Sequence, residues 1–345
     1  MGEISNLKMY KEIMETPSKV EHLLELYTKN DKFNFNNKMI EKLKKADQII
    51  FIACGTSYHA CRFGVDFFTR AGKMSDAYIA SEWAYNPVVY GKNPVFILVS
   101  QSGETGDILA CKFYQPNTII AITNNKDSSI DKLATYSIPL DCGEEKGIAA
   151  TKSFATQYIV LYLLAAAVQD NTSAIEDVKK SIEGIKEVFE LEEKISKAAD
   201  IFVPRNRAFL LGRGIDYLSA TEGSLKIKET SYMFAEPYAS GEFKHGYIAL
   251  VEFGVPVIGL LSSSTTSNVF RQNLDDVKSK GGQLVVISSL KLSKPDDQIV
   301  TPSISPYIDP LLQIIALQIL AMHISFKKGI DTDSPRSLVK SVKGE

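Results

Sequence analysis

The sequence predicts an α/β protein in which a doubly wound sheet of parallel strands occurs twice. Short segments rich in β-branched and aromatic residues alternate with helical stretches, and turns containing glycine and serine join them. This alternation favours parallel strands that are linked by right-handed crossovers. The same order of segments recurs in the second half of the chain, which indicates an internal duplication.

The first half opens with roughly forty residues of amphipathic helical pattern, in which Ile13, Val20 and Leu24 stand among charged residues. We expect the first strand at 49–53, a turn at 54–57 and a helix from 58 to about 71. Further strands are expected at 95–99, 118–122 and 136–140.

The second half repeats this order. A strand at 208–211 leads into Gly212-Arg213-Gly214 and then into a helix that runs through Glu229. The offsets between the copies lie between roughly 154 and 165 residues. The matching segments are 256–261 with 95–99, 284–288 with 119–123, and 235–238 with 81–85.

These patterns divide the chain into five expected segments. A helix at 310–326 closes the second copy, and the tail after Gly329 is polar, contains Pro335 and is expected to be irregular. The expected boundaries are 1–44 for N-terminal helices, 45–170 for the first α/β domain, 171–200 for a charged helical linker, 201–328 for the second domain and 329–345 for the tail.

Composition limits the possible functions. The chain has 345 residues, enough for two domains, with 45% hydrophobic and 23% charged residues. A net charge of −2 without long blocks of one sign argues against nucleic acid or a membrane surface as a partner. The longest apolar run, 158–168, is too short to cross a bilayer, and the N-terminus lacks the pattern of a secretory signal.

Neither a metal site nor a nucleotide cofactor is expected. The four cysteines show no C-x-x-C spacing and the four histidines are scattered, so we expect a protein of the reducing cytoplasm without disulfides. The chain has no G-x-x-x-x-G-K-[ST] loop, and Gly212-Arg213-Gly214 lacks the third glycine of a dinucleotide fingerprint.

The most informative segment is Ser100-Gln101-Ser102-Gly103-Glu104-Thr105. It follows an apolar strand and precedes an expected helix that begins near Asp107, so free N–H groups, hydroxyls and a helix dipole favour a phosphate there. An ordinary helix cap by Ser102 is the alternative. Cys54-Gly55-Thr56-Ser57 lies at the same carboxyl edge of the sheet, where ligands bind in open α/β folds.

The two copies differ at this turn. The second has Ser262-Ser263-Ser264-Thr265-Thr266, with neither the glycine nor the acid of the first. We therefore expect only the first copy to hold a ligand phosphate.

Three charged residues share one face of the expected helix before residue 230. Glu222, Lys226 and Glu229 stand at positions i, i+4 and i+7. On spacing alone, a solvated face with ion pairing is the favoured interpretation. The helix follows a glycine turn at a strand end, however, where ligands bind in this architecture.

Two further residues carry reactive groups. His245 lies between glycines in a loop, where it is either exposed without a role or a proton shuttle. Lys340 lies in the tail, where a lysine is normally exposed. If the tail folds back, Leu338, Val339 and Val342 give it an apolar setting, in which a lysine has a lowered pKa and forms Schiff bases with carbonyls.

From about Met9 to Glu345 the chain resembles the isomerase part of the glucosamine-6-phosphate synthase family, which is built from two sugar isomerase (SIS) domains. The resemblance implies two tandem SIS domains, each a three-layer αβα sandwich with a mainly parallel, flavodoxin-like sheet. It rests on six motifs that occur in order. They are Cys54-Gly55-Thr56-Ser57, Ser100-Gln101-Ser102-Gly103-Glu104-Thr105, Ala149-Ala150-Thr151-Lys152, Leu225-Lys226-Ile227-Lys228-Glu229, Gly241-Glu242-Phe243-Lys244-His245-Gly246 and Leu338-Val339-Lys340-Ser341-Val342.

The resemblance also implies roles. Glu229 would move a proton between C1 and C2 of an open-chain hexose 6-phosphate, Lys226 would polarise the C1 oxygen, and Glu222 would support this helix face. His245 would assist ring opening from the neighbouring subunit of a homodimer, and Lys340 would form a Schiff base with the ketose carbonyl. The implied substrate-binding residues are Cys54, Gly55, Thr56, Ser57, Ser100, Gln101, Ser102, Thr105, Ile148, Ala150 and Val339.

The chain departs from this family in several places. Position 2 is Gly2, and the sequence begins almost at the isomerase part, so we expect no glutaminase activity and no ammonia production from glutamine. Ala150 stands where the family usually has serine, Tyr247 where it has proline, and Val339 where it has a small alanine.

We therefore expect an enzyme of amino-sugar phosphates, foremost a glucosamine-6-phosphate deaminase that releases ammonia. The alternatives are the isomerase component of a synthase whose glutaminase is a separate polypeptide, and a fructosamine-6-phosphate deglycase. A sugar-phosphate sensor is the non-enzymatic alternative, but such modules usually join one SIS copy to a DNA-binding domain.

Overall fold

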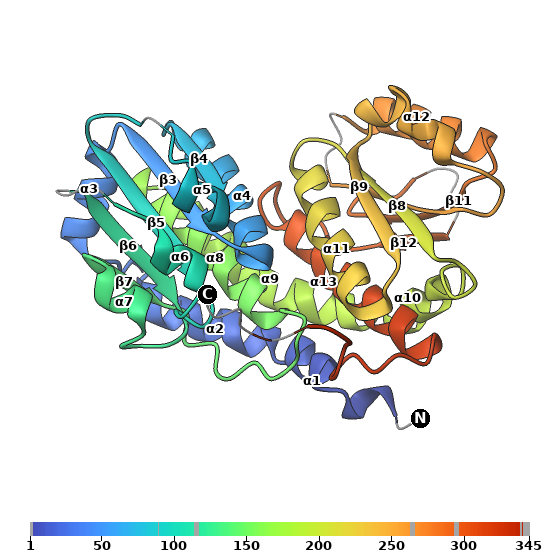
Figure 1. Cartoon of the computed structure of the whole chain (residues 1–345), viewed down its shortest axis with the longest axis horizontal. Coiled ribbons are helices and arrows are strands. Elements are labelled where there is room, and N and C mark those ends of the chain that lie inside the picture. The colour runs from blue at the N-terminus through green and yellow to red at the C-terminus, as the bar shows by residue number, and fades with distance from the viewer. Residues whose placement is uncertain are drawn as a thin grey trace. The chain divides into compact units, whose positions relative to one another are not determined.

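The structure is a computed structural model that describes residues 3–88, 90–113, 117–262, 266–292, 297–338 and 340. The chain forms two compact units (Figure 1). Unit 1 contains residues up to 17, 146–151 and 180–338. Unit 2 contains residues 18–145 and 152–179 together with Lys340.

Unit 2 is built on a five-stranded parallel sheet in the order β4-β3-β5-β6-β7. Counted along the chain this is the order 2-1-3-4-5 of flavodoxin-like folds. The strands are β3 (Gln48–Ala53), β4 (Ser75–Ile79), β5 (Pro94–Ser100), β6 (Thr118–Thr123) and β7 (Tyr136–Pro139).

Helices cover both faces of this sheet, because its strands are apolar on both sides. Phe51 packs toward α4 (Gly55–Arg70) and α8 (Lys152–Val168). Ile50 and Ile52, which alternate with it, pack against the opposite layer. That layer is formed by α5 (Ala80–Tyr85), α6 (Gly106–Ala110) and α7 (Ser129–Leu133).

Before this sheet the chain forms α1 (Lys8–Met14), α2 (Thr16–Tyr27) and α3 (Asn37–Lys45). The amphipathic pattern of this region predicted the helices but not the small hairpin between them. Strands β1 (Thr28–Lys29) and β2 (Lys32–Phe33) form it, and Asn30 and Asp31 adopt left-handed φ angles of 52° and 55° at its turn. Asparagine and aspartate tolerate this conformation better than other residues with side chains.

Unit 1 repeats the architecture. Its parallel sheet has the order β12-β11-β10-β8-β9, which is again 2-1-3-4-5 along the chain. This shared topology supports the predicted duplication. The strands are β8 (Arg207–Gly212), β9 (Phe234–Ala239), β10 (Pro256–Leu261), β11 (Gln283–Ser288) and β12 (Asp297–Val300).

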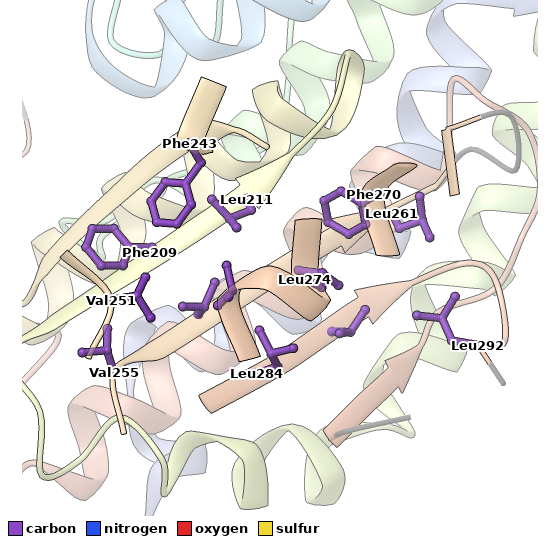
Figure 2. Close-up of a cluster of buried hydrophobic side chains, with 13 residues drawn as sticks. Phe209, Leu211, Phe243, Val251, Val255, Leu261, Phe270, Leu274, Leu284 and Leu292 are labelled. Carbon is purple, nitrogen blue, oxygen red and sulfur yellow. The ribbon is translucent and has the colours of Figure 1, made fainter. Parts of the chain in front are cut away.

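One face of the second sheet packs against α12 (Ser267–Ser279). Figure 2 shows Phe270 and Leu274 of this helix beside Leu211 and Leu261 in a continuous apolar cluster. The other face carries α11 (Ile215–Ser231) and α13 (Asp309–Lys327). These two helices pack closely, because a Cβ at Gly223 of α11 would lie 2.5 Å from a methyl carbon of Leu317 of α13. The expected α/β fold is thereby confirmed in both copies.

The linker region contains α9 (Ser173–Phe189) and α10 (Glu192–Ala199). Residues 330–338 contain no helix or strand. Helix α13 is long and apolar enough to cross a membrane by length and composition alone, but 94% of its most apolar window is buried inside the structure. This burial is typical of a core helix.

One expectation about the repeat was wrong. Residues 235–238 lie in strand β9, whereas residues 81–85 lie in helix α5, so these two segments are not counterparts. The counterpart of β9 is β4, because each is the edge strand beside the first strand of its sheet. The polar β4 has no apolar pattern that would have revealed it.

Candidate functional site

The turn after β5 gathers hydroxyl groups at the carboxyl edge of the first sheet. The hydroxyl Oγ of the buried Ser100 lies 2.8 Å from Oγ1 of Thr105 and accepts a hydrogen bond from the Gly103 N–H at 3.1 Å. Oγ of Ser102 accepts one from the Glu104 N–H at 3.2 Å. Hydroxyls and backbone N–H groups therefore converge at this edge, and both are donors that phosphate oxygens accept.

Gly103 and Glu104 shape this turn. Gly103 has φ +69°, and a Cβ at that position would lie 2.1 Å from Oγ of Ser128, so only glycine fits. The Glu104 carboxylate accepts hydrogen bonds from the N–H of Ser129 at 2.9 Å and from its hydroxyl at 2.7 Å. The acid thus fixes the turn to the start of α7 and is not itself part of an anion cradle.

The expected helix after this turn is short. Helix α6 spans only Gly106–Ala110, and its N-cap residue Thr105 makes no capping hydrogen bond with its side chain. A single turn of helix adds little dipole. The expected helix dipole is therefore a smaller contribution here than the hydroxyls and the N–H groups of the turn.

The turn after β3 lies at the same edge, because β3 and β5 are parallel neighbours with Ala53 opposite Val99. Gly55 has φ +54° where α4 begins. Oγ of Ser57 accepts a hydrogen bond of 3.0 Å from Nε2 of Gln157 in α8. Gln157 is 1% exposed, and its Oε1 has no hydrogen-bond partner within the described part of the chain.

Sequence reasoning missed Gln157. Its signal was a polar residue close to the apolar run 158–168, which becomes a fully buried helix. The thiol of Cys54 lies 3.8 Å from Oδ2 of Asp107, and burial, aided by this carboxylate, raises its pKa to about 11. Cys54 is therefore protonated at neutral pH, which argues against nucleophilic chemistry there.

Lys340 has an unexpected setting in unit 2. Its Nζ lies 2.7 Å from Oε2 of Glu145, whose side chain is fully buried. Glu145 also accepts hydrogen bonds from the N–H and the hydroxyl of Ser153, at 3.1 and 2.7 Å, at the start of α8. The expected apolar setting of Lys340 is not what the structure shows, since its partner is a carboxylate and Leu338 is 39% exposed. Val339 and Val342 lie outside the described residues.

In unit 1, α11 carries the predicted trio on a buried face. Nζ of Lys226 lies 3.4 Å from Oε1 of Glu222 and 2.7 Å from Oε2 of Glu229. The side chains of Lys226 and Glu222 are fully buried, and that of Glu229 is 22% exposed. The favoured interpretation of a solvated face was therefore wrong. The i, i+4, i+7 spacing fits an exposed face as well as a buried one, and the packing of α11 against α13 makes this face buried.

Glu229 combines charge with a free acceptor. Its Oε2 is buried and, among the described residues, forms no hydrogen bond of acceptable geometry, so its contact with Lys226 is an ion pair only. A carboxylate oxygen held beside a cation without a hydrogen bond is available to accept a proton from a substrate.

The remaining predicted residues of unit 1 lie in loops. His245 is exposed directly after the short helix Glu242–Lys244, and within the described part of the chain its ring has no hydrogen-bond partner. Tyr247, two residues further, packs its ring against that of Tyr238 at a tilt of 34°, with ring centroids 4.3 Å apart. Ile148 and Ala150 are half-buried in a segment without regular structure.

The carboxyl edge of the second sheet differs from that of the first. Asp216 lies in the first turn of α11, and its carboxylate accepts hydrogen bonds from the N–H of Ser262 at 3.0 Å and from its hydroxyl at 2.6 Å. Asp216 follows Gly214 by two residues, as Ser57 follows Gly55, and both glycines have positive φ. A carboxylate of the chain itself therefore lies at this edge. Residues 263–265 lie outside the described part.

No group of three or more histidine, cysteine, aspartate or glutamate side chains among the described residues is arranged to hold a metal ion. Four cysteines are free, and three of them are buried.

Comparison with known proteins identifies the family. The family description of the SIS domain matches residues 42–167 and 201–307, which contain all strands of the two parallel sheets. The chain belongs to the SIS domain family. Both SIS domains have the predicted parallel sheet, and each contains a glycine-marked turn between the first strand of its sheet and the following helix.

Among curated relatives, the glutamine–fructose-6-phosphate aminotransferase of Lactiplantibacillus plantarum is 37% identical over 97% of this chain. The chain spans 58% of that protein, and the same share of a Bacillus licheniformis aminotransferase that is 35% identical. It thus corresponds to the part of these enzymes that contains the SIS domains.

Solved structures show the same fold. The C-terminal domain of the glucosamine-fructose-6-phosphate aminotransferase from Francisella tularensis superposes with a TM-score of 0.89 at 28% identity, covering 96% of this chain and 98% of that one. A glucosamine-6-phosphate deaminase from Thermotoga maritima superposes with a TM-score of 0.79 at 24% identity, covering 97% and 99%. The second likeness supports the fold alone.

Proposed function

We propose that this SIS protein interconverts glucosamine 6-phosphate and fructose 6-phosphate, and that it acts as a deaminase that releases ammonia. The observation that carries the proposal is the pair of Glu229 and Lys226, in which a carboxylate without a hydrogen bond lies 2.7 Å from a fully buried ammonium. Aldose–ketose conversion needs one base that reaches two adjacent carbons and a cation near the oxygen that gains charge.

The phosphate is anchored in the first copy alone. The hydroxyls of Ser57, Ser100, Ser102 and Thr105 bind its oxygens. The other substrate-binding residues of these two turns are Gln101, Cys54, Gly55 and Thr56. The hydroxyls of Ser102 and Thr105 lie within 3.5 Å of the Ser100 hydroxyl, and this clustering supports the assignment. Asp216 at the corresponding edge of the second copy repels an anion, which supports a single phosphate site.

Proton transfer takes place at the other end of the open-chain sugar. Glu229 removes the proton from C2, and the electron pair moves through C1 onto the C1 oxygen, beside the Lys226 ammonium. Glu229 then returns the proton to C1 while the C2 amine becomes an imine, and the proton that the nitrogen loses passes to the C1 oxygen, which becomes a hydroxyl. Ile148, Ala150 and Val339 line this part of the sugar, and Glu222 holds Lys226 in place.

Release of ammonia uses Lys340. Its ammonium first gives a proton to Glu145, 2.7 Å away, and the free amine attacks C2 of the imine. The attacking nitrogen of Lys340 passes its protons to the sugar's nitrogen, which leaves as ammonia. A Schiff base then joins Lys340 to C2 of the sugar. Water then hydrolyses this bond, so that one water is consumed for each ammonia and each fructose 6-phosphate formed.

Ring opening precedes these steps. We assign it to His245, which gives a proton to the ring oxygen. Because His245 is exposed in its own chain, it acts on the site of the second subunit of a homodimer. Subunits carrying Glu229→Gln, mixed and exchanged with subunits carrying His245→Ala, regain activity above either parent if this assignment is right.

One assay tests the proposed reaction. The purified chain is mixed with glucosamine 6-phosphate, and ammonia and fructose 6-phosphate are measured. Equal amounts of both products support the deaminase. Turnover of fructose 6-phosphate only when a glutaminase and glutamine are added identifies the synthase component instead, and tight binding of the sugar phosphate without turnover identifies a sensor.

The split synthase stays the second candidate, because the curated relatives with these SIS domains are aminotransferases. A deglycase that acts on fructosamine 6-phosphates uses Glu229 and His245 but has less need of Lys340. Activity of a Lys340→Ala variant on such a substrate, but not on glucosamine 6-phosphate, would favour it. Four free cysteines agree with the reducing cytoplasm as the place of action.

A further inference from the structure

Helix α1 lies between two segments that lead to proposed site residues, although it belongs to neither sheet. Its side chains at positions 9, 12 and 13 share one buried face, as i, i+3 and i+4 positions do on a helix. Met9 and Ile13 are apolar, and α1 packs against α13 within unit 1. Glu12 is 5% exposed, so a carboxylate is buried among apolar neighbours.

The Glu12 carboxylate binds the backbone of the segment 146–151. It accepts hydrogen bonds from the N–H groups of Lys146 and Gly147, the latter at 3.0 and 3.2 Å from its two oxygens. A Cβ at Gly147 would lie 2.6 Å from Oε2 of Glu12, so this approach also requires the glycine. The segment has no regular structure of its own, and it carries Ile148 and Ala150.

The start of α1 is bound by the tail. The side chain of the N-cap residue Leu7 makes no capping hydrogen bond. The carboxylate of Asp333, 325 residues after Lys8 in the sequence, caps the helix instead. It accepts hydrogen bonds from the N–H of Lys8 at 2.9 and 3.0 Å. A carboxylate at a helix N-terminus is favourable both as an acceptor and as a charge. Lys340 follows Asp333 by seven residues.

We propose that Glu12 and Asp333 are positioning residues, which hold the sugar-lining segment 146–151 and the Lys340-bearing tail in register through α1. Neither contacts the substrate. Glu12 and Asp333 are joined through one seven-residue helix, α1. Loss of the Glu12 contact therefore disturbs the tail, and loss of the Asp333 contact disturbs the segment 146–151. The link to substrate rests on the proposed function, whereas the coupling through α1 does not.

Hydrogen exchange of the full chain tests the coupling without any substrate. In Glu12→Gln, amide exchange rises about tenfold in the peptide 330–338, which contains Asp333, as well as in 146–151. In Asp333→Asn it rises in 146–151. Glu187→Gln, the same chemical change at an exposed site of α9, alters neither peptide. Exchange that rises only in the peptide contacted directly would overturn the coupling.

Kinetics test the positioning role. Glu12→Gln raises the KM for glucosamine 6-phosphate about tenfold, whereas Asp333→Asn lowers kcat and the borohydride trapping of fructose 6-phosphate on Lys340 by a similar factor. The loss in the double variant is smaller than the product of the single losses. Single variants that match Glu187→Gln in KM, kcat and trapping overturn the role.

The two tests fail separately. A wild-type chain that does not turn over glucosamine 6-phosphate contradicts the proposed function, while the exchange data still decide the coupling. If Glu12→Gln does not fold, Gly147→Ala disturbs the same contact from the other side and faces the same exchange test, since its added Cβ meets Oε2 of Glu12.

Discussion

The ammonium of Lys340 and the carboxylate of Glu145 form an ion pair of 2.7 Å, in which the carboxylate is fully buried and the lysine side chain is 27% exposed. Glu145 is also held by two hydrogen bonds from Ser153. The lysine is therefore presented by a fixed carboxylate that can take its proton, and not by an apolar pocket.

Replacement of Lys340 by alanine is expected to abolish ammonia release, because no amine remains to attack C2 of the sugar. Binding of fructose 6-phosphate, measured by calorimetry, stays within about threefold of wild type, since other residues are assigned to the phosphate. Lys132→Ala, at an exposed lysine of α7 in the same unit, serves as the matched control. Wild-type turnover by Lys340→Ala would remove the Schiff-base step.

Two alanine substitutions separate the cost of a left-handed backbone from the cost of a steric clash at Gly103. Gly103→Ala adds a Cβ 2.1 Å from Oγ of Ser128 at φ +69°. Gly143→Ala has a similar φ of +73°, but its nearest neighbour is Nζ of Lys19 at 3.5 Å. We expect Gly143→Ala to destabilise by about 1 kcal/mol, the cost of the left-handed backbone.

Gly103→Ala is expected to cost more than this and also to weaken fructose 6-phosphate binding by about a hundredfold, because the hydroxyls of the turn shift. Urea denaturation and calorimetry measure the two effects. Equal stability and equal binding in the two variants would contradict the assignment of this turn to the phosphate.

The buried Asp216 predicts a pH dependence of stability. Burial raises its pKa from 3.8 to about 6, against the opposing effect of the hydrogen bonds from Ser262. The folded chain therefore binds more protons than the unfolded chain between about pH 4 and 6, so this group lowers stability as the pH rises through that window.

Asp216→Asn removes this dependence and keeps an acceptor for the Ser262 N–H. Relative to wild type it gains stability between pH 4 and 7, by up to about 3 kcal/mol. Denaturation curves at several pH values measure the gain, and Asp275→Asn at an exposed position of α12 is the control. A difference between wild type and Asp216→Asn that does not change with pH would disprove the raised pKa.

The α11 trio separates stability from catalysis. Glu222→Gln removes one partner of a fully buried lysine, and breaking a buried ion pair costs about 3 kcal/mol or more in unfolding free energy. Glu229→Gln is expected to cost less stability, because its side chain is partly exposed, but to lower kcat by a factor of about a hundred to ten thousand. Thermal unfolding and ammonia release measure both. The reverse order of effects would mean that Glu229 is structural.

The sequence predicts most strands because their residues are apolar on both faces, as buried parallel strands require. Residues 95–99 and 118–122 fall within β5 and β6. Edge strands are different, since β4 is polar and half-covered and gives no such pattern. The lengths of helices also depend on packing, which is why α6 ends after five residues.

The candidate site shows the same limit. Motifs locate Ser100, Lys226 and Lys340, but burial and partners are tertiary properties that spacing does not contain. The spacing of Glu222, Lys226 and Glu229 favoured an exposed helix face, whereas the structure buries this face. Gln157, Glu145 and Glu12 contact site segments from distant parts of the chain, and only Gln157 has a local signal, its place beside the apolar run 158–168.

The Asp216 carboxylate on Ser262 has a consequence for how a duplicated fold specialises. Two equivalent halves would offer an anionic substrate two alternative sites. On the proposed function, the Asp216 carboxylate takes the place of a ligand anion in one half, so the phosphate binds in the other. The half with the carboxylate needs no anchoring groups and can carry groups for proton transfer instead.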